Sequence, residues 1–223
     1  MNKTMSKSIL LVLIAVISLV MVTTISKAGV KGSKHDLSST GPEGGVKTDG
    51  TDQVCVFCHT PHFSSNTVPL WNRNNSAVTN YTLYSSATLV ATPAQPGGIS
   101  AACLSCHDGT VAFDSLLNKP GSGTGAPTWE FTGAGQTSGK MTGASTKLGT
   151  NLSDDHPISF AYLASAKLNT ATDGKVGGLP LFSNKVECAS CHNVHEWGSA
   201  GTTAPFLRAT NAGSALCLTC HIK

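Results

Sequence analysis

Hydrophobic residues along this 223-residue chain occur mostly in short, broken runs, with one exception at its start. After residue 28 the apolar positions follow no sustained 3.6-residue period, so no long amphipathic helix is predicted. Strand-like alternation is scattered, and the stretch from Tyr81 to Val90 is its clearest example. Much of the rest is Gly, Ser, Thr, Asn and Ala. The pattern indicates a poor builder of hydrophobic core, which must obtain its buried surface from something other than its own side chains.

The exception is an uncharged apolar run over residues 9–25, preceded by Lys3 and Lys7. Small residues, Ser26 and Ala28, stand at the positions that a signal peptidase reads. The layout predicts a secretory signal peptide over residues 1–28, cleaved after Ala28, and an exported domain over residues 29–223. The alternative is a transmembrane anchor, for which the run is barely long enough.

The net charge of the exported domain limits the classes of partner that it is expected to bind. Cleavage after Ala28 removes three of the 15 Lys and Arg residues and none of the 12 Asp and Glu residues, leaving a formally neutral chain. The sequence pI of about 8.4 therefore belongs to the precursor and does not indicate a basic surface for nucleic acid. No other stretch is apolar enough to span a bilayer, so we expect no membrane span after cleavage.

All eight cysteines occur in four C-x-x-C pairs, and each pair is followed directly by a histidine. This spacing is typical of c-type haem attachment, because two thiols add to vinyl groups on one porphyrin edge and the next imidazole binds the iron. Four motifs predict four covalently bound haem c groups, numbered I to IV in chain order. The attachment residues are Cys55, Cys58 and His59; Cys103, Cys106 and His107; Cys188, Cys191 and His192; and Cys217, Cys220 and His221.

Two other readings of the cysteines compete with haem attachment. Zinc sites use paired cysteines in tetrahedral sets, but they leave the four adjacent histidines unexplained. Export also permits disulfides, although a bridge within C-x-x-C is a redox-active arrangement rather than a structural one.

The histidine count matches the haem count. Beyond the four motif histidines there are four more, which are His35, His62, His156 and His195. If all eight bind iron, every haem has two imidazole ligands, and the low reduction potentials of such haems are expected. Met141 is the one methionine left after cleavage, so methionine is nearly excluded as a ligand. Closed iron leaves no position for a substrate, so the sequence predicts electron transfer, no enzyme activity and no catalytic residues.

The motifs repeat in the same order in two halves of the chain. His35, the first two motifs and Arg73 have counterparts in His156, the last two motifs and Arg208. We interpret this as a duplicated dihaem module, with pseudo-repeats at about 29–118 and 152–223. A Gly/Ser/Thr-rich segment between them, about 119–151, reads as a surface loop or linker.

The C-H-x-x-H units suggest how the haems are linked. If the motif continues as a helical turn, His59 and His62 lie on one face, so His62 should reach a haem other than its own. We hypothesise that His195 reaches back to haem I, and that His35 and His156 serve haems II and IV. By the repeat, His62 then binds haem III of a neighbouring subunit, which predicts a head-to-tail filament. Alternatively, His62 binds a haem of its own chain.

Several other residues have two readings each. Arg73 and Arg208 either pair with haem propionates or are solvated. The indoles of Trp71, Trp129 and Trp197 either pack on haem faces or are buried in the ordinary way. The acids next to His156 read as solvated side chains.

These motifs also carry a family resemblance. Cys55-Val-Phe-Cys58-His59-Thr-Pro-His62, Pro69-Leu-Trp-Asn-Arg73 and the terminal Cys217-Leu-Thr-Cys220-His221-Ile-Lys resemble the doubled-CxxCH multihaem c-type cytochromes. The greatest likeness is to extracellular tetrahaem cytochromes that polymerise into conductive filaments (nanowires of the OmcE type), and it covers about residues 35–223.

The resemblance implies a fold of mostly irregular coil, with a few short helices and minimal strand, wrapped around a chain of four stacked haems. It also implies two histidines per iron, one of them supplied by a neighbouring copy of the chain. Redox proteins, extracellular minerals or electrodes are the implied electron donors and acceptors.

Three functions are therefore compared. The first is an extracellular filament of copies of this chain that conducts electrons. The second is a monomeric periplasmic electron shuttle, and the third is a multihaem reductase, which needs an open iron position.

Overall fold

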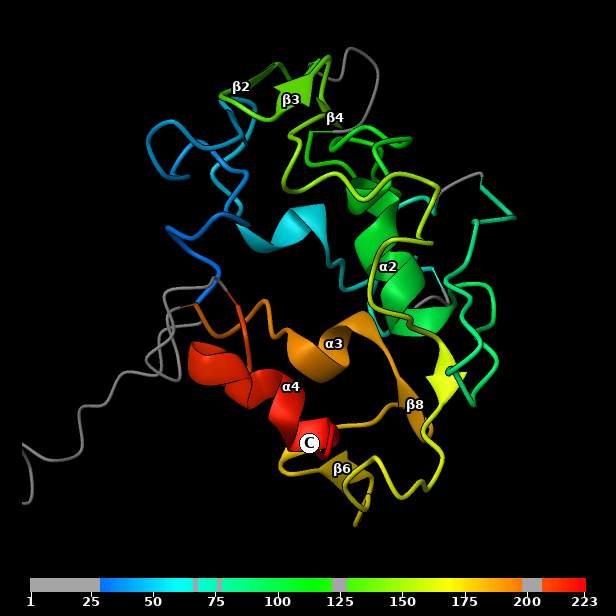
Figure 1. Ribbon diagram of the computed structural model, residues 1–223. Helices are drawn as coiled ribbons and strands as arrows, with labels where there is room; N and C mark the ends of the chain where they lie inside the picture. The colour runs from blue at the N-terminus through cyan, green and yellow to red at the C-terminus, as the bar shows by residue number, and fades with distance from the viewer. Residues whose placement is uncertain (1–28, 66–67, 76–77, 122–127, 198–205) are drawn as a thin grey trace, which may run out of the picture.

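The computed structural model describes residues 29–65, 68–75, 78–121, 128–197 and 206–223 (Figure 1). The predicted signal peptide, residues 1–28, lies outside the described residues. In Figure 1 the first repeat, coloured blue to green, occupies the upper part of the molecule, and the second repeat, yellow to red, occupies the lower part.

The helices are short and coincide with the four cysteine motifs. They are η1 (Cys55–Phe57), α2 (Gly98–His107), α3 (Cys188–Cys191), η3 (Ala212–Ser214) and α4 (Ala215–Cys220). A single helical turn places residues three apart on one face, so the two cysteines of each motif point the same way. Hydrophobic periodicity does not detect these helices because each is only one to three turns long.

The strands are two residues long and pair as four antiparallel ladders: β1 (Lys47–Thr48) with β2 (Phe131–Thr132), β3 (Gln136–Thr137) with β4 (Lys140–Met141), β5 (Phe160–Ala161) with β8 (Lys185–Val186), and β6 (Lys175–Val176) with β7 (Leu179–Pro180). The alternation from Tyr81 to Val90 does not form a strand. It contributes one isolated bridge, between Thr82 and Asn151, because no neighbouring segment pairs with the rest of it.

The buried apolar side chains form three separate clusters rather than one core. They are Val56, Phe57 and Trp129; Tyr81, Leu104 and Leu152; and Tyr162, Val176 and Val186. The first two clusters use residues inside the first two cysteine motifs, and Cys220 packs against the third cluster. Each cluster therefore adjoins a motif, and none of them is large enough to act as the core of a domain this size.

Residues 119–151, predicted as a surface loop or linker, pack against the first repeat. Trp129 is buried, and its ring lies 5.6 Å from that of Phe57. The register of β1 and β2 pairs Lys47 with Thr132. One large apolar side chain among small polar ones fixes the segment in place, and composition alone does not show this.

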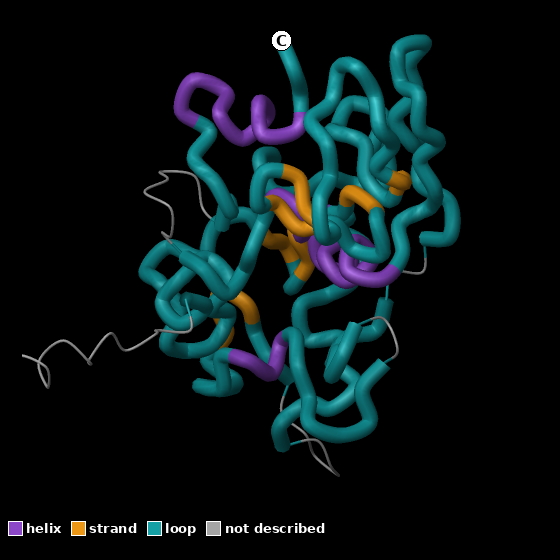
Figure 2. Tube along the Cα trace, turned by 90° about the horizontal axis from the view of Figure 1, so that it is seen from below, coloured by secondary structure: helices purple, strands orange, loops and turns teal. Residues whose placement is uncertain are grey.

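Loops trace most of the described chain (Figure 2). Within that part of the chain, no helix is both long enough and apolar enough to cross a bilayer. That the coil wraps around stacked haems stays a prediction.

Candidate functional site

Each cysteine motif is one helical turn closed by its own histidine. The backbone N–H of His59 donates to the carbonyl of Cys55 at 2.8 Å, and His192 and His221 donate in the same way to the first cysteine of their motifs. In the second motif the same residues end α2. The turn presents two thiols on one face, with the imidazole directly after them, which is the arrangement that haem attachment requires.

The thiols of successive motifs influence one another, so the four motifs lie in one continuous row. Burial, followed by the neighbouring Cys106 thiol, raises the pKa of Cys58 to about 12. A hydrogen bond with Cys188, together with burial, raises the pKa of the Cys103 thiol. Burial and the neighbouring Cys220 raise the pKa of Cys191. Each motif thus touches the next one, in the order of the sequence.

Six of the eight histidines form three pairs, each joining a motif histidine to one outside the motifs. The ring centroids are 6.0 Å apart for His35 and His107, 6.1 Å for His59 and His195, and 6.5 Å for His156 and His221.

These distances fit two imidazoles on opposite sides of one iron. An imidazole nitrogen lies about 1.1 Å from the ring centre when ring bonds are about 1.33 Å long. Metal–imidazole bonds measure about 2.0–2.1 Å. The centroids of two ligands on one iron are therefore about 6.2–6.4 Å apart, close to all three measured values.

Hydrogen bonds orient the imidazoles for metal binding. The Nδ1 of His107 lies 2.7 Å from the Thr146 carbonyl oxygen, and that of His156 lies 2.9 Å from the Pro157 carbonyl oxygen. An N–H that donates to a carbonyl fixes the tautomer and leaves Nε2 with its lone pair free for iron.

Burial keeps the His35 imidazole unprotonated at neutral pH. It lowers the pKa of His35 to about 4, with further lowering by His107, His192 and His195. Phe206 covers the same imidazole, at 4.6 Å between ring centroids. Because only neutral imidazole binds a metal, His35 is ready to act as a ligand at neutral pH.

His62 and His192 are the two histidines left over. No other histidine ring lies against either of them among the residues that the structure describes. The His62 side chain is exposed, while its backbone carbonyl accepts hydrogen bonds from Thr60 Oγ1 and Asn118 Nδ2, both at 2.9 Å. Burial, followed by His107, lowers the pKa of His192.

The helical continuation expected from His59 to His62 does not occur. The helical turn ends at His59, which instead forms an isolated bridge with Trp71. Pro61 explains this end, because a proline disfavours helical geometry in the residue before it. His62 is therefore not stacked above His59 on a helix face, and its side chain is exposed to solvent.

A cavity of about 570 Å³ lies beside the first motif. This volume falls within the roughly 300–1,000 Å³ of ordinary ligand sites. Its lining consists of Gln53, Val54, Cys55, Val56, His59, Thr60, Pro61, Asn118, Lys119, Pro120 and Gly121. Cys55 and His59, two of the residues predicted to hold haem I, thus line this cavity.

The tryptophans near this motif are buried, and one polar group of each is unused. Within the described residues, the buried indole N–H groups of Trp71 and Trp129 lack hydrogen-bond partners. Trp71 meets the His59 ring edge-on at 6.2 Å, and the Lys119 ammonium lies 4.7 Å from the Trp129 ring centre. Trp197, in contrast, is 41% exposed and packs on Phe206. A buried donor without a partner is unusual in a folded protein, and a polar group of a bound ligand could satisfy it.

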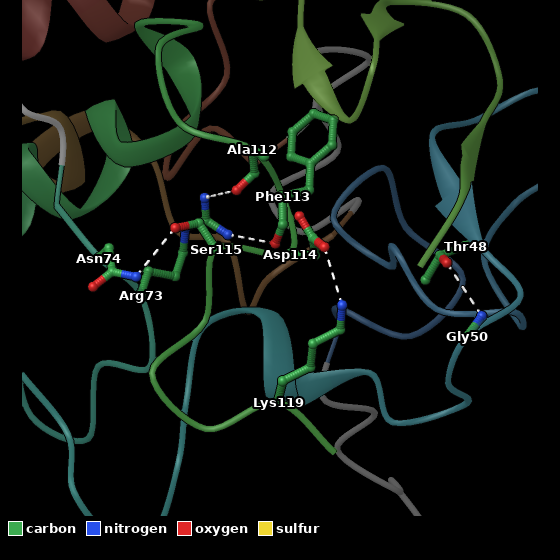
Figure 3. Close-up of polar contacts among 9 residues, drawn as sticks. All are labelled: Thr48, Gly50, Arg73, Asn74, Ala112, Phe113, Asp114, Ser115 and Lys119. Carbon is green, nitrogen blue, oxygen red and sulfur yellow. Dashed lines mark hydrogen bonds and ion pairs between the residues drawn. The ribbon is translucent and has the colours of Figure 1, made fainter. Parts of the chain in front are cut away.

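Arg73 is neither solvated nor free to bind a propionate. It is 1% exposed, and its guanidinium donates to three backbone carbonyls and one hydroxyl. Figure 3 shows two of these acceptors, the carbonyls of Ala112 and Phe113. Neither of the two readings of the sequence, propionate pairing or a solvated side chain, anticipated this burial, because arginine is rarely buried without a carboxylate. Its repeat counterpart, Arg208, donates from Nε to the Ala189 carbonyl at 2.7 Å.

Sequence reasoning missed three buried carboxylates, those of Asp36, Asp108 and Glu187. Two of them directly follow proposed iron ligands, in the pairs His35–Asp36 and His107–Asp108. The recurrence of an aspartate directly after a proposed ligand histidine was the sequence signal that could have revealed these carboxylates. The acids beside His156 differ, since Asp154 is exposed and Asp155 is only partly buried.

The alternative uses of the cysteines gain no support. All eight cysteines and all eight histidines lie within the described residues, and no three metal-binding side chains there converge on one position. None of the eight cysteines forms a disulfide.

Comparison with known proteins agrees with the motif chemistry. Residues 181–223 match the doubled CXXCH motif family, and the match includes the third and fourth motifs. Comparison with curated proteins found no match. The doubled motif implies covalently bound haem c and suggests an electron carrier rather than an enzyme. This chain, which has two further motifs of the same kind, is thus supported as a multihaem c-type cytochrome that takes part in electron transfer.

Proposed function

We propose that this protein is an exported tetrahaem cytochrome whose copies join head to tail into an extracellular filament that conducts electrons. The proposal depends mainly on one observation. Three histidine pairs at 6.0–6.5 Å leave one imidazole, His62, without an iron, and one motif histidine, His192, without a second ligand.

The pairs support a ligand assignment for three haems within the chain. His59 and His195 would hold haem I, His35 and His107 haem II, and His156 and His221 haem IV. This leaves His192 to hold haem III from one side only. An intrachain partner for His192 would have to be His62, because every other histidine already belongs to a pair.

The surroundings of His62 favour a contact with another molecule. Phe63 is 88% exposed and Leu70 is 51% exposed, so apolar surface flanks the free imidazole. An exposed apolar group next to a metal ligand is suited to docking. When a ligand on one surface of a subunit binds an iron held at a different surface of the next copy, the contact is heterologous and can repeat without closing, so a filament results.

Electron transfer follows from the closed coordination. Haem c supplies an iron that changes between the ferric and ferrous states. In the filament, seven histidines of each chain together with His62 of a neighbouring copy would fill both ligand positions of its four irons, so no position would be open to a substrate. Two histidine ligands also forgo the rise in potential that a methionine ligand gives, so low potentials are expected.

The experiment replaces His62 in the full, haem-loaded protein. His62→Ala should give a soluble tetrahaem monomer, seen by negative-stain microscopy, in which one haem of four lacks its sixth ligand and becomes high-spin by electron paramagnetic resonance. His195→Ala is the matched control: it also removes one ligand, but from a pair within the chain, so filaments should still form.

Two outcomes would count against the proposal. If His62→Ala forms filaments with an unchanged low-spin spectrum, His62 is not the intersubunit ligand. If the unaltered protein stays monomeric with four low-spin haems, His62 closes haem III within its own chain, and the protein is a monomeric shuttle.

A further inference from the structure

The same backbone arrangement accompanies the first and the third cysteine motif. The carbonyl of Leu70 accepts the N–H of Thr60, the residue after the first motif, at 2.8 Å. The carbonyl of Phe206 accepts the N–H of Asn193, the residue after the third motif, at 2.7 Å. Leu70 and Phe206 therefore occupy equivalent positions in the two repeats.

The hydrogen bonds two residues further along the chain agree with this correspondence. The N–H groups of Asn72 and Arg208 donate to the carbonyl of the second cysteine of the first and third motif, at 2.9 and 2.8 Å. Their side chains also donate to the carbonyl of the residue after the first cysteine, both at 2.7 Å. The structure thus aligns Arg208 with Asn72, one residue before the Arg73 that the order of the sequence motifs pairs with it.

Leu70 and Phe206 also share a backbone conformation that large side chains rarely adopt. Their φ angles are 59° and 64°, in the left-handed region that favours glycine. A large residue remains in this region only where its surroundings compensate for the strain, and such positions are concentrated in binding sites. The contacts that compensate each residue therefore bear on its function.

Phe206 is compensated by burial against the first repeat. It is 7% exposed, and its ring centroid lies 4.6 Å from that of His35. Since His35 belongs to the first repeat, this contact lies at the junction between the two repeats. At the same junction, His195 of the second repeat lies beside His59 of the first, at 6.1 Å between ring centroids.

Leu70 has the equivalent backbone position but is 51% exposed. The counterpart of His35 in the second repeat is His156, because each of them pairs with the last motif histidine of its own repeat, His107 or His221. His156 is exposed as well. A single copy of the chain thus exposes two side chains whose equivalents bury one another at the junction between the repeats.

We propose that the contact between copies reproduces the junction between the repeats, with Leu70 of one copy covering the His156 imidazole of its neighbour. The inference rests on the proposed function, in which His62 binds haem III of that neighbour. His62 then stands to the third motif as His195 stands to the first, so the same arrangement brings Leu70 onto His156 as brings Phe206 onto His35. Removing the leucine side chain from water stabilises the contact.

Leu70→Asp tests this contact in the full, haem-loaded protein and keeps all eight histidines. Aspartate enters the left-handed region more readily than leucine, and the position is exposed, so the variant should fold and carry four haems by mass. The protein concentration at which filaments form should rise by about tenfold or more, because the contact loses apolar burial and gains a charge without a partner. Light scattering measures this concentration, and negative-stain microscopy identifies the filaments.

Two further variants serve as controls. Leu70→Phe supplies the side chain that the second repeat has at the equivalent position, so it should assemble at no higher concentration than the unaltered protein. Val90→Asp is the matched control, because Val90 is 69% exposed but lies outside the arrangement that the repeats share. It should leave the concentration for assembly unchanged.

A photo-crosslink locates the contact directly and does not depend on weakening it. With p-benzoylphenylalanine in place of Leu70, illumination of the filaments should join neighbouring copies. Mass spectrometry of the digested product should find the attachment in the peptide that contains His156.

The outcomes separate this inference from the proposed function. If the unaltered protein forms no filaments, the proposed function fails and this inference fails with it. If the unaltered protein forms filaments and Leu70→Asp, carrying four haems, forms them at the same concentration, the inference alone is overturned. It is also overturned if Val90→Asp impairs assembly as much as Leu70→Asp, if Leu70→Phe assembles less readily, or if the crosslink attaches to a peptide without His156.

Discussion

At the scale of single residues, the proposed iron ligands differ chiefly in their burial. His35 lies between His107 and Phe206, and burial lowers its pKa to about 4. His156 and His221, in contrast, are exposed. A lowered pKa means that an imidazole released from iron stays unprotonated at any pH above about 4 and can bind again.

We therefore expect the His35–His107 pair to resist acid. In ferric protein at pH 5, the low-spin resonance of this haem should persist, and it should decline only as the pH falls through about 4, the pKa of His35. Electron paramagnetic resonance across an acid titration measures the pH at which this resonance is lost.

The variant His35→Ala provides the control for the acid titration. It should lack the acid-resistant low-spin component at every pH, including pH 7. If that component persists in His35→Ala, it belongs to another haem, and the burial argument is wrong.

At the scale of elements, the two repeats meet where α2 packs on α3. The carboxylate of Glu187, which caps α3, accepts hydrogen bonds from the hydroxyls of Ser100 and Ser159 and from the N–H of Ser190. The Ser100 hydroxyl in turn accepts the backbone N–H of Cys188 at 3.1 Å. A single acid thus connects the second motif, the third motif and the strand region before it.

Replacing this acid should loosen the junction. Glu187→Ala leaves two buried hydroxyls and a helix-terminal N–H without their acceptor, and each such group costs about 1–3 kcal/mol. Some of this cost is recovered as water enters, so we expect the free energy of unfolding of the haem-loaded protein to fall by about 2–4 kcal/mol. Denaturant titration followed by circular dichroism measures the change.

Glu43→Ala is the matched control for this substitution. The Glu43 side chain is 99% exposed and its ion pair with Lys47 is 3.5 Å long, so its loss should change stability by no more than about 0.5 kcal/mol. Equal losses for Glu187→Ala and Glu43→Ala would show that the network does not hold the repeats together.

At the scale of the whole molecule, the sequence predicts the chemistry better than the packing. The Cys55–His59 motif is readable because attachment chemistry requires that local spacing. The separate hypothesis that His195 reaches back to haem I agrees with the position of its ring, 6.1 Å from that of His59. The burial of Trp129 and Arg73 depends on contacts with distant segments, which no local pattern encodes. The alternation from Tyr81 to Val90 wrongly suggested a strand for the same reason, since a strand requires a partner segment.

The described residues provide little apolar core. The three clusters contain three buried residues each and are not joined, and each adjoins a cysteine motif. The largest fully buried side chain is the charged Arg73 rather than an apolar one. A chain of this kind needs additional buried surface to offset the conformational entropy of folding, and four porphyrin rings are suited to supply it.

Haem attachment should therefore be coupled to folding. A chain with all eight cysteines replaced by serine should be largely disordered, with collapsed amide dispersion in its NMR spectrum and no cooperative thermal transition. Losing only the last motif, through Cys217→Ser and Cys220→Ser, should disorder the C-terminal end and the nearby Tyr162–Val176–Val186 cluster while the first repeat stays protected from hydrogen exchange. A cooperative transition in the cysteine-free chain would mean that the three small clusters suffice for folding, and that the haems only occupy a structure formed without them.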